Sequence, residues 1–456
     1  MIRVSPSHSS LRRFPVPTGT SPALTTPVPG ALNNERAREL AAQFPLLQRS
    51  VMDQPLVYLD SGATSQRPQS VLDAEFDFLR SSYSAVHRGA HTVAVEATDA
   101  FEQARETVAN FVGAGPREIV WTSNATEAIN LITYAFSNAS AGSNGAGEAS
   151  QQFRLGPGDQ IVVTESEHHA NLVPWQELCA RTGAELRWIP VDDHGVLDLP
   201  AVDSVITEQT RVVSFTHVSN VTGAVNDVAA LVDAARKVGA FTVLDACQSV
   251  PHLPVNFHEL GVDFAAFSGH KMLGPTGIGA LYGRAELLDV LPTFLTGGSM
   301  ITSVTMERSE YLPAPTRFEA GTQRISQAVA LAEAVRFLDA VGMENVATWE
   351  SELGQRLAAG VAQLPGIRLI GPQPGVDRVG LASVVVEGVH AHDVGQLLDV
   401  AGVAVRVGHH CAQPLHRRLG VTATTRASTY LYNTTDDVDR LLNELAGVRR
   451  YFRLED

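Results

Sequence analysis

The chain has 456 residues, of which 44% are hydrophobic and 18% charged, so it is typical of a globular protein with two or three domains. The formal net charge of −15 argues against sequence-independent nucleic-acid binding, because phosphate contacts need a basic face. No apolar run approaches the roughly 18 residues that a membrane span requires, so we expect no membrane insertion.

The N-terminal stretch lacks a globular composition. Residues 1–34 contain no acidic residue and many prolines, serines and threonines, so they cannot bury enough apolar surface to offset the entropy of ordering. Arginines and serines give the stretch some transit-peptide character, but its prolines would break an amphipathic helix. We therefore predict a disordered tail over residues 1–35.

Short apolar runs alternate with helical patterns through the middle of the chain. Expected strands lie at residues 117–123, 159–165, 210–219, 240–246 and 262–269. Residues 172–183 and 228–239 have helical patterns that end in glycine, as a C-cap does. This alternation predicts βαβ units around a buried parallel sheet. The low-complexity residues 137–152 read as a flexible surface insert.

Two side chains at the ends of neighbouring expected strands suggest a cofactor. Asp245 ends the run "FTVLD", and Lys271 follows the next run, "VDFAAFSGHK". Taken singly, they are an ordinary helix cap and a solvated lysine. Together they match what pyridoxal phosphate needs: a lysine for the Schiff base and a carboxylate that holds the pyridinium proton. Carboxyl ends of parallel strands meet at one edge of a sheet, which favours this interpretation.

Two further stretches follow expected strands. In "TSNATEAINLI", Thr126 stands where a helix begins, which suits a phosphate as well as a simple N-cap. In "TESEHHANLVPW", His168 and His169 have no third ligand at metal-binding spacing, so we predict stacking on a flat cofactor and no metal site.

Together these stretches make the chain resemble a SufS-type (group II) cysteine desulfurase of the aminotransferase class V family. The matching motifs run in order and include "YLDSGATSQRP", "EHHANLVPW", "VLDACQSVPH", "FSGHKMLGPTGIG", "RFEAGT" and "VRVGHHCAQP". The resemblance implies the α/β fold of fold-type I pyridoxal-phosphate enzymes. A segment at 36–58 would pack on the small domain, a large domain would span 59–335, and a smaller α+β domain would span 336–456.

The resemblance also implies how the cofactor is held. Lys271 would carry pyridoxal 5'-phosphate, Asp245 would pair with its ring nitrogen, and Gln248 would bind its ring hydroxyl. His168 would stack on the ring and take part in catalysis.

Five residues would hold the phosphate. Thr126, Ser268 and His270 would do so directly, with Thr322 supplied by the other subunit of a homodimer. Where the family often has a second hydroxyl residue, this chain has Ala125, so only the backbone N–H remains there to donate.

The substrate would be L-cysteine. Asn220 and Arg426 would bind its carboxylate, and Arg406 would lie near the cysteine loop. Cys411 would attack the substrate sulfur and keep it as a persulfide while alanine leaves. Its neighbours in "VRVGHHCAQP" are cationic and polar, which favours the thiolate.

The other two cysteines are expected to be inert. Cys179 lies on the apolar stripe of an expected helix, and Cys247 is expected to face packing. Three cysteines in a chain of this length argue against a disulfide scaffold and for a reducing compartment, so we expect a cytoplasmic protein.

A persulfide needs an acceptor, which by resemblance would be a SufU- or SufE-type protein serving iron–sulfur cluster assembly. His392 is a candidate for contact with a zinc-containing SufU, although an ordinary surface histidine fits equally well. Selenocysteine lyase or another fold-type I enzyme remain alternatives, because the same cofactor residues would serve them. A non-catalytic scaffold fits poorly with an intact Lys271, Asp245 and Cys411.

Overall fold

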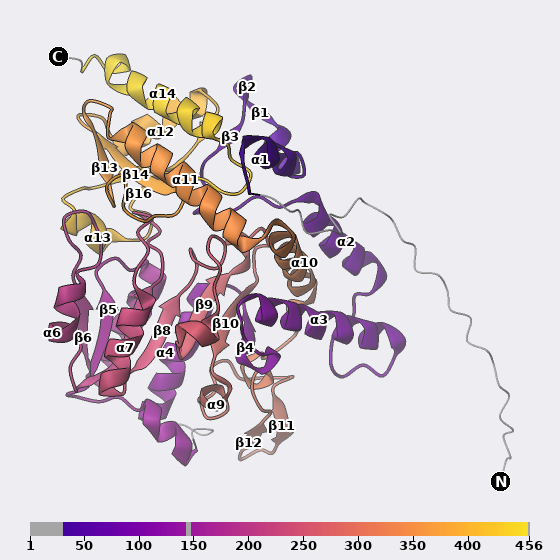
Figure 1. Ribbon diagram of the computed structural model, residues 1–456. Coiled ribbons are helices and arrows are strands. Elements are labelled where there is room, and N and C mark those ends of the chain that lie inside the picture. The colour runs from indigo at the N-terminus through magenta and orange to yellow at the C-terminus, as the bar shows by residue number, and fades with distance from the viewer. Residues whose placement is uncertain (1–30, 143–146, 455–456) are drawn as a thin grey trace, which may run out of the picture.

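The computed structural model describes residues 31–142 and 147–454 (Figure 1). Most of the predicted tail therefore lies outside the described residues, and helix α1 (Asn34–Ala41) begins within its last two positions. The expected insert at 137–152 is shorter in the structure. Helix α4 (Ala125–Ala141) extends into it because Phe136 and Ala139 pack in the core, and a 3-10 helix, η3 (Glu148–Phe153), follows the undescribed residues.

A seven-stranded sheet lies at the centre of the larger domain (Figure 1). Its strand order is β4 (Ile119–Thr122), β10 (Gly279–Gly283), β9 (Phe264–Ser268), β8 (Phe241–Asp245), β7 (Thr210–Thr216), β5 (Gln160–Thr164) and β6 (Glu185–Ile189). Strand β10 is antiparallel to both of its neighbours, and the pairs from β9 to β6 are parallel. The predicted α/β class with a mainly parallel sheet is thereby confirmed.

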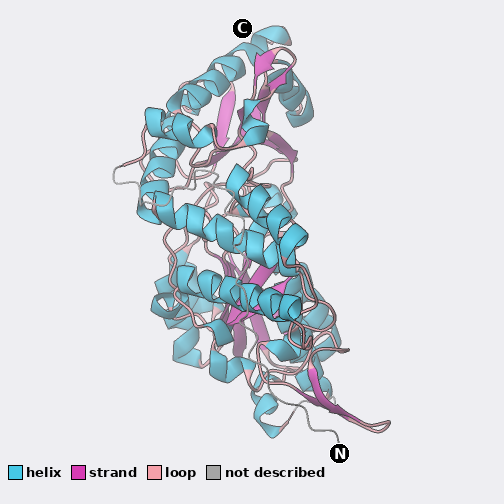
Figure 2. Cartoon of the chain, turned by 90° about the vertical axis from the view of Figure 1, so that its right-hand side faces the viewer, coloured by secondary structure: helices cyan, strands magenta, loops and turns pink. Residues whose placement is uncertain are grey.

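Helices cover both faces of this sheet, as the period-2 alternation of its strands requires (Figure 2). Val243 faces the cluster formed with α4 and α5 (Val173–Thr182), whereas the next residue, Leu244, faces the opposite cluster. The second face is covered by α7 (Val228–Val238), α3 (Thr92–Phe111) and α10 (Ile325–Val341), with α2 (Gln69–Ser81) packed on α10.

The glycines expected to end two helices do so. Gly183 follows α5 with φ of 79°, and Gly239 follows α7 with φ of 73°, both in the left-handed region that favours glycine. Asp227 caps the other end of α7, because its side chain accepts a hydrogen bond from Ala230 N.

The C-terminal domain has an antiparallel four-stranded sheet. Its strand order is β13 (Ile367–Ile370), β14 (Leu381–Val386), β17 (Thr424–Ser428) and β16 (Arg406–Gly408), and its helices are α11 (Met343–Val361), α12 (Ala391–Val400), α13 (Gln413–Arg418) and α14 (Thr435–Tyr451). The expected domain boundary at residue 335 falls inside α10, whose buried residues continue to Val341.

The N-terminal segment contacts the C-terminal domain. Strand β3 (Val57–Tyr58) pairs in parallel with β15 (Val403–Ala404), and Asn34 Oδ1 accepts a hydrogen bond from Thr435 N at 2.9 Å. The remaining elements are β1 (Ser50–Val51), β2 (Gln54–Pro55), α6 (Val202–Val205), α8 (Phe257–Leu260), α9 (Ala285–Leu288), the hairpin β11 (Ile301–Val304) and β12 (Ser309–Tyr311), and the 3-10 helices η1 (Pro45–Gln48), η2 (Pro116–Glu118), η4 (His169–Asn171), η5 (Leu199–Ala201), η6 (Gly269–Lys271) and η7 (Thr316–Phe318).

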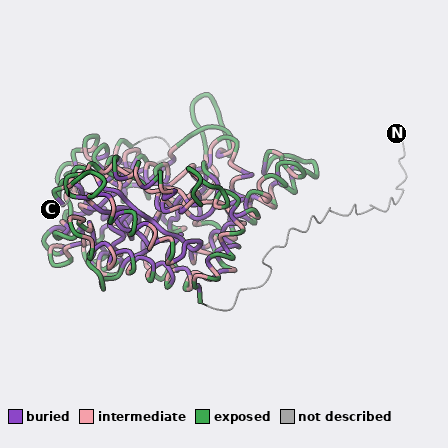
Figure 3. Tube along the Cα trace, turned by 90° about the horizontal axis from the view of Figure 1, so that it is seen from above, coloured by how far each residue is buried: buried purple, intermediate pink, exposed green. Residues whose placement is uncertain are grey.

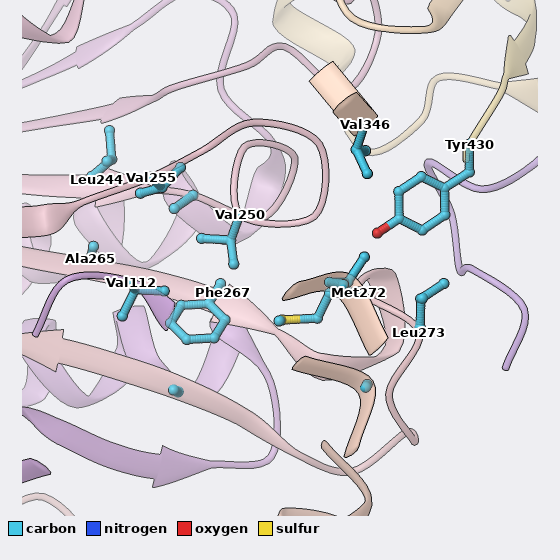
Figure 4. Packing of buried hydrophobic residues seen from close by; sticks show 14 of the residues in the cluster. Val112, Leu244, Val250, Val255, Ala265, Phe267, Met272, Leu273, Val346 and Tyr430 are labelled. Atoms are coloured by element: carbon cyan, nitrogen blue, oxygen red, sulfur yellow. The ribbon is translucent and has the colours of Figure 1, made fainter. Parts of the chain in front are cut away.

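One hydrophobic core joins the two domains. Phe267 of the large sheet, Met272 and Leu273 after it, and Val346 and Tyr430 of the C-terminal domain belong to the same buried cluster (Figure 4). Seen from above, buried chain runs through the middle of the molecule and exposed chain surrounds it (Figure 3). In the part of the chain that the structure describes, no helix is long and apolar enough to cross a membrane.

Candidate active site

A cavity of about 210 Å³ lies where the carboxyl ends of the large sheet meet the C-terminal domain. Asp245 and Ser268 are the last residues of β8 and β9, so both point to the same edge of the sheet. The predicted site residues that line the cavity are Ala125, Thr126, His168, Asn220, Asp245, Gln248, Ser268, His270, Lys271, Arg406, Cys411 and Arg426. Thr322 is exposed and does not line the cavity of its own chain.

Lys271 ends η6, a single turn directly after β9. The turn is fixed from the N-terminal segment, because the carbonyl of His270 accepts hydrogen bonds from Ser65 N and from Thr64 Oγ1, both at 3.0 Å. Among the described residues, no side chain forms a hydrogen bond or ion pair with the Lys271 amine. The amine is therefore held at the cavity and left available.

Asp245 is 4% exposed and has no basic partner among the described residues. Its Oδ1 accepts a hydrogen bond from Cys247 N at 3.0 Å within a turn, and no helix begins there, so Asp245 is not the helix cap that the sequence offered as the simpler interpretation. A ligand with a cationic N–H group, bound in the cavity, would supply the basic partner that Asp245 lacks among the described residues.

Gln248 and His168 face the same cavity. The Gln248 amide donates from Nε2 to Gly62 O at 2.7 Å, and its buried Oε1 has no partner in the described part of the chain. His168 Nδ1 accepts from Ala170 N at 3.0 Å, so the neutral ring carries its proton on Nε2. Burial, together with the charge of Lys271, lowers the His168 pKa to about 4. The ring is thus a flat, uncharged surface at neutral pH.

Helix α4 begins at the cavity and is capped by Asn124, not by Thr126 as the sequence suggested. Asn124 Oδ1 accepts a hydrogen bond from Glu127 N at 2.9 Å, so the cap uses neither the backbone N–H nor the hydroxyl of Thr126. The Ala125 N–H already donates to Ser268 Oγ at 2.9 Å, so the donor expected there is occupied. A first turn with unpaired donors favours an anion.

A glycine allows this helix end to lie against the sheet. A Cβ at Gly279 would lie 2.7 Å from Asn124 Cα and from Phe267 O, which no side chain tolerates. Nearby His270 is neutral, because burial and the charges of Lys271 and Arg67 lower its pKa to about 4. Gly279 therefore allows the start of α4 to lie directly against β10.

Two arginines stand opposite each other at the other end of the cavity. Arg406 of β16 pairs in register with Arg426 of β17. Like charges at directly opposed positions repel, so the pair favours an anion between them. Burial lowers the Arg426 pKa to about 10, which leaves the guanidinium charged, and its buried Nε has no partner among the described residues.

Asp60 was missed as a site residue, although it lies in the quoted motif "YLDSGATSQRP". Its Oδ1 lies 3.3 Å from Arg426 Nη2, and Arg426 Nη1 donates to Asn220 O at 2.9 Å. Burial raises the Asp60 pKa although Arg426 lowers it. The side chain of Asn220, expected to bind substrate, donates from Nδ2 to His410 O at 2.7 Å.

Glu167 was also missed, and the sequence offers no signal for it beyond its place before His168. Its side chain is 1% exposed, with Oε1 accepting from Thr216 N at 2.9 Å and Oε2 from Asn171 Nδ2 at 2.7 Å. Burial raises its pKa to about 8, so it is neutral at pH 7. It joins the ends of β5 and β7 beneath the cavity.

The three cysteines differ in exposure. Cys411 is exposed, whereas Cys179 and Cys247 are partly buried. Cys247 does pack on the core but also lines the cavity, which the sequence did not predict. Burial and nearby Asp245 raise the Cys247 pKa to about 12, and burial raises that of Cys179 to about 11. Both remain thiols, which are poor nucleophiles.

Comparisons with known proteins identify the family of the chain. Residues 57–441 match the model of the aminotransferase class-V family. The chain is 57% identical over 413 residues to "Probable cysteine desulfurase 2" of Mycobacterium leprae (strain TN), covering 90% of this chain and 95% of the relative. It is 47% identical over 429 residues to a "Probable cysteine desulfurase" of Streptomyces coelicolor, covering 94% and 100%. The crystal structure of cysteine desulfurase CsdA from Escherichia coli is similar at a TM-score of 0.80 and 36% identity, covering 92% and 99%.

Proposed function

The chain is an enzyme that belongs to the aminotransferase class-V family, and on this premise we propose that it is a SufS-type cysteine desulfurase. It converts L-cysteine to L-alanine and retains the sulfur as a persulfide on Cys411. One observation carries the proposal: the exposed thiol of Cys411, from the C-terminal domain, lines the same cavity as Lys271 and Asp245 of the large domain.

The residues of the cavity fit pyridoxal 5'-phosphate. Asp245 is a buried carboxylate without a basic partner among the described residues, which suits a protonated ring nitrogen. Gln248 Oε1 is buried and unpaired, which suits a ring hydroxyl. The first turn of α4 offers Thr126 to a phosphate, with Ser268 and His270 beside it. Because Ser268 occupies the Ala125 N–H, Ser268 takes over the contact expected of Ala125.

When bound, pyridoxal phosphate supplies an electron sink for the substrate Cα. Lys271 would attach the cofactor and would carry the proton that leaves and returns at the reacting carbons of the substrate. Asp245 would pair with the ring nitrogen, and His168, which is neutral at pH 7, would offer its flat ring to the cofactor. Arg406 and Arg426 hold the substrate carboxylate between them. Orientation of this kind contributes much of an enzyme's rate acceleration.

Cys411 is the residue that takes the sulfur from the substrate. Its thiolate attacks the substrate sulfur, so that a sulfur–sulfur bond forms while the carbon–sulfur bond of the substrate breaks. The electron pair of the broken bond stays with the carbon, which gains a proton and leaves as alanine. The carbon is reduced as the two sulfurs are oxidised to the persulfide level, so no external oxidant is required.

The working unit is a homodimer in this proposal, with Thr322 of each chain completing the phosphate site of the other. Three observations support it. Thr322 is exposed and outside its own cavity. Helix α2 exposes Leu72, Phe76 and Leu79, with Phe76 at 59%. The hairpin β11–β12 leaves Met306 98% exposed, far from the C-terminal domain (Figure 1). Large apolar side chains exposed on one helix, as on α2, favour a protein interface.

The persulfide passes to a SufU- or SufE-type acceptor for iron–sulfur cluster assembly in this proposal. His392 lies exposed near the start of α12, with Gln396 Nε2 at 3.3 Å from its Nε2, so the ring is accessible to a zinc-containing partner. His392→Ala should reduce sulfur transfer to SufU and leave the first alanine turnover unchanged, whereas His258→Ala, another exposed histidine, should change neither. Equal loss of transfer and first turnover would contradict a role in transfer alone.

The deciding experiment measures alanine formed per subunit when cofactor-loaded protein meets excess cysteine without reductant or acceptor. We expect a burst of about one alanine per active site in the wild type and none in Cys411→Ser. No alanine from either protein, with normal cofactor content, would contradict the desulfurase proposal. Equal alanine from both would remove Cys411 from the sulfur step and favour a selenocysteine lyase, for which turnover of selenocysteine is the matching assay.

A further inference from the structure

The segment that carries Cys411 has an unusual backbone. His410 and Cys411 have φ of 49° and 56°, so two consecutive residues with side chains occupy the left-handed region. Gly408, just before them, has φ of 118°. Such conformations persist only where the surroundings hold them in place. We refer to residues 408–413 as the cysteine loop.

One residue of the large domain, His169, makes two hydrogen bonds to the cysteine loop. The backbone N–H of His169 donates to Cys411 O at 2.6 Å, and the ring Nε2 of His169 accepts from Gln413 N at 3.1 Å. Asn220 Nδ2 adds a third contact from the same domain, to His410 O.

The ring of His169 has to be neutral for this arrangement, because Nε2 accepts a hydrogen bond only in the tautomer that carries its proton on Nδ1. Partial burial and the neighbouring His409 lower the His169 pKa, which keeps the ring in that neutral form. His169 directly follows His168, which lines the cavity. One dipeptide therefore connects the cavity wall to the backbone that carries the thiol.

We propose that His169 is a positioning residue for the sulfur step, which fixes the Cys411 thiol relative to the bound substrate by clamping the cysteine loop. The inference rests on the proposed desulfurase function and adds a residue to it. His169 does not itself touch the reacting atoms. Its loss leaves cofactor attachment and substrate binding intact and misplaces the nucleophile, and small misplacements of a reacting group are costly.

Three variants distinguish a specific effect of His169 on the cysteine loop from a general structural role. His169→Leu keeps bulk but removes the acceptor, and His169→Gln restores an acceptor oxygen close to the position of Nε2. His258→Leu is the control, because His258 is an exposed histidine that lies on α8 and does not line the cavity. All are tested as the cofactor-loaded full chain.

The primary measurement is the single-turnover rate of alanine formation from cysteine. We expect it to fall between about tenfold and a hundredfold in His169→Leu. It should return to within a few-fold of the wild type in His169→Gln and remain unchanged in His258→Leu. Cofactor absorbance and its change on adding cysteine should be the same in every variant, as should turnover of selenocysteine, which does not need Cys411.

A second measurement does not depend on activity. Alkylation of Cys411 by iodoacetamide, followed by mass spectrometry, should be faster in His169→Leu than in wild type, because a released loop exposes the thiol to reagent more often. Should His169→Leu fail to fold, His169→Asn replaces it, since that side chain is too short to reach Gln413 N.

The outcomes are distinguishable from failure of the proposed function. A wild-type protein that forms no alanine overturns the desulfurase proposal itself. A wild-type burst together with an unchanged rate in His169→Leu overturns the clamp alone. Parallel losses of cofactor binding, selenocysteine turnover and alanine formation would also overturn it, because they would reveal a general structural role.

Discussion

The two sides of the cavity are built differently. On the large-domain side, Asp245 and Ser268 end buried strands whose backbones are fixed by hydrogen-bonded neighbours on both sides. On the C-terminal side, Cys411 lies on a loop in left-handed conformation, held mainly by side chains and backbone of the other domain. The large-domain side is therefore fixed by the sheet itself, whereas the loop on the C-terminal side is held by a few contacts.

This difference matches two chemical tasks. A cofactor that remains bound through every turnover needs donors fixed in one geometry, which strand ends and a helix N-terminus provide. A sulfur carrier must meet the substrate inside the cavity and later meet an acceptor outside it. A loop held by few hydrogen bonds can shift at low cost, because local opening requires little loss of packing.

We expect the largest effect from removing Lys271, on the large-domain side. The chain has two lysines, Lys271 and Lys237, and the latter is exposed on α7. Lys271→Ala should abolish covalent cofactor attachment and reduce alanine formation by about 10³-fold or more. Borohydride reduction followed by peptide mass spectrometry reads the attachment directly. Lys237→Ala should match the wild type in both assays, and a label that moves to Lys237 would place the cofactor elsewhere.

Glu167 tests the large-domain side in a second way. Its hydrogen bonds connect strand ends of the large sheet, so a change at this residue should affect the stability of the whole fold. Its pKa rises from an ordinary 4.5 to about 8, so between these pH values the unfolded chain releases a proton that the folded chain keeps. Stability of the wild type therefore falls as pH rises through this window.

Glu167→Gln removes this dependence, since the amide does not titrate. Relative to the wild type, the variant should gain stability from pH 5 to pH 9 by on the order of a few kcal/mol. Urea unfolding at both pH values measures the difference. A constant difference between the two proteins would mean that Glu167 is ionised in the folded state at all these pH values.

The smallest effect is expected at the loop. Gly408→Ala places a side chain at φ of 118°, with no atom within 4 Å of the new Cβ, so its cost is conformational only. We expect a loss of about 1–3 kcal/mol in loop stability, with unchanged cofactor content. Gly447→Ala in α14 is the control, because it also meets no atom within 4 Å but lies in a helix, where alanine is favoured. Loss of cofactor in Gly408→Ala would contradict the separation of the two sides.

The sequence predicted which large-domain residues gather at the cavity, because these residues lie at or next to strand ends. Asp245 and Lys271 follow successive apolar runs, and parallel strands bring such positions to one edge whatever else the chain does. The helix start at Thr126 was located, but its cap was not. Asn124 supplies the cap, and a stretch with several polar residues does not reveal which one leaves the helix geometry.

The contacts on the sulfur side could not be read from the sequence. Arg426 and Asp60 are 366 positions apart, and Gln413 and His169 are 244 apart, so no period or motif links them. The register that sets Arg406 opposite Arg426 depends on how β16 and β17 pair, since a slip of one residue would turn one of them away.

By itself, then, the sequence determined the family, through motifs that match it in order along the chain. It also determined the α/β class and the residues that gather at the edge of the large sheet, because hydrophobic alternation and strand-end chemistry are local properties. Only the tertiary structure decided that Asp60 orients Arg426, that Glu167 is neutral beneath the cavity, and that His169 holds the cysteine loop. These depend on docking the C-terminal domain against the sheet and on burial. Both arise from packing between residues that are far apart in the chain. Burial of the shared core offsets the entropy lost in closing such long loops, and no short stretch of sequence reveals these contacts.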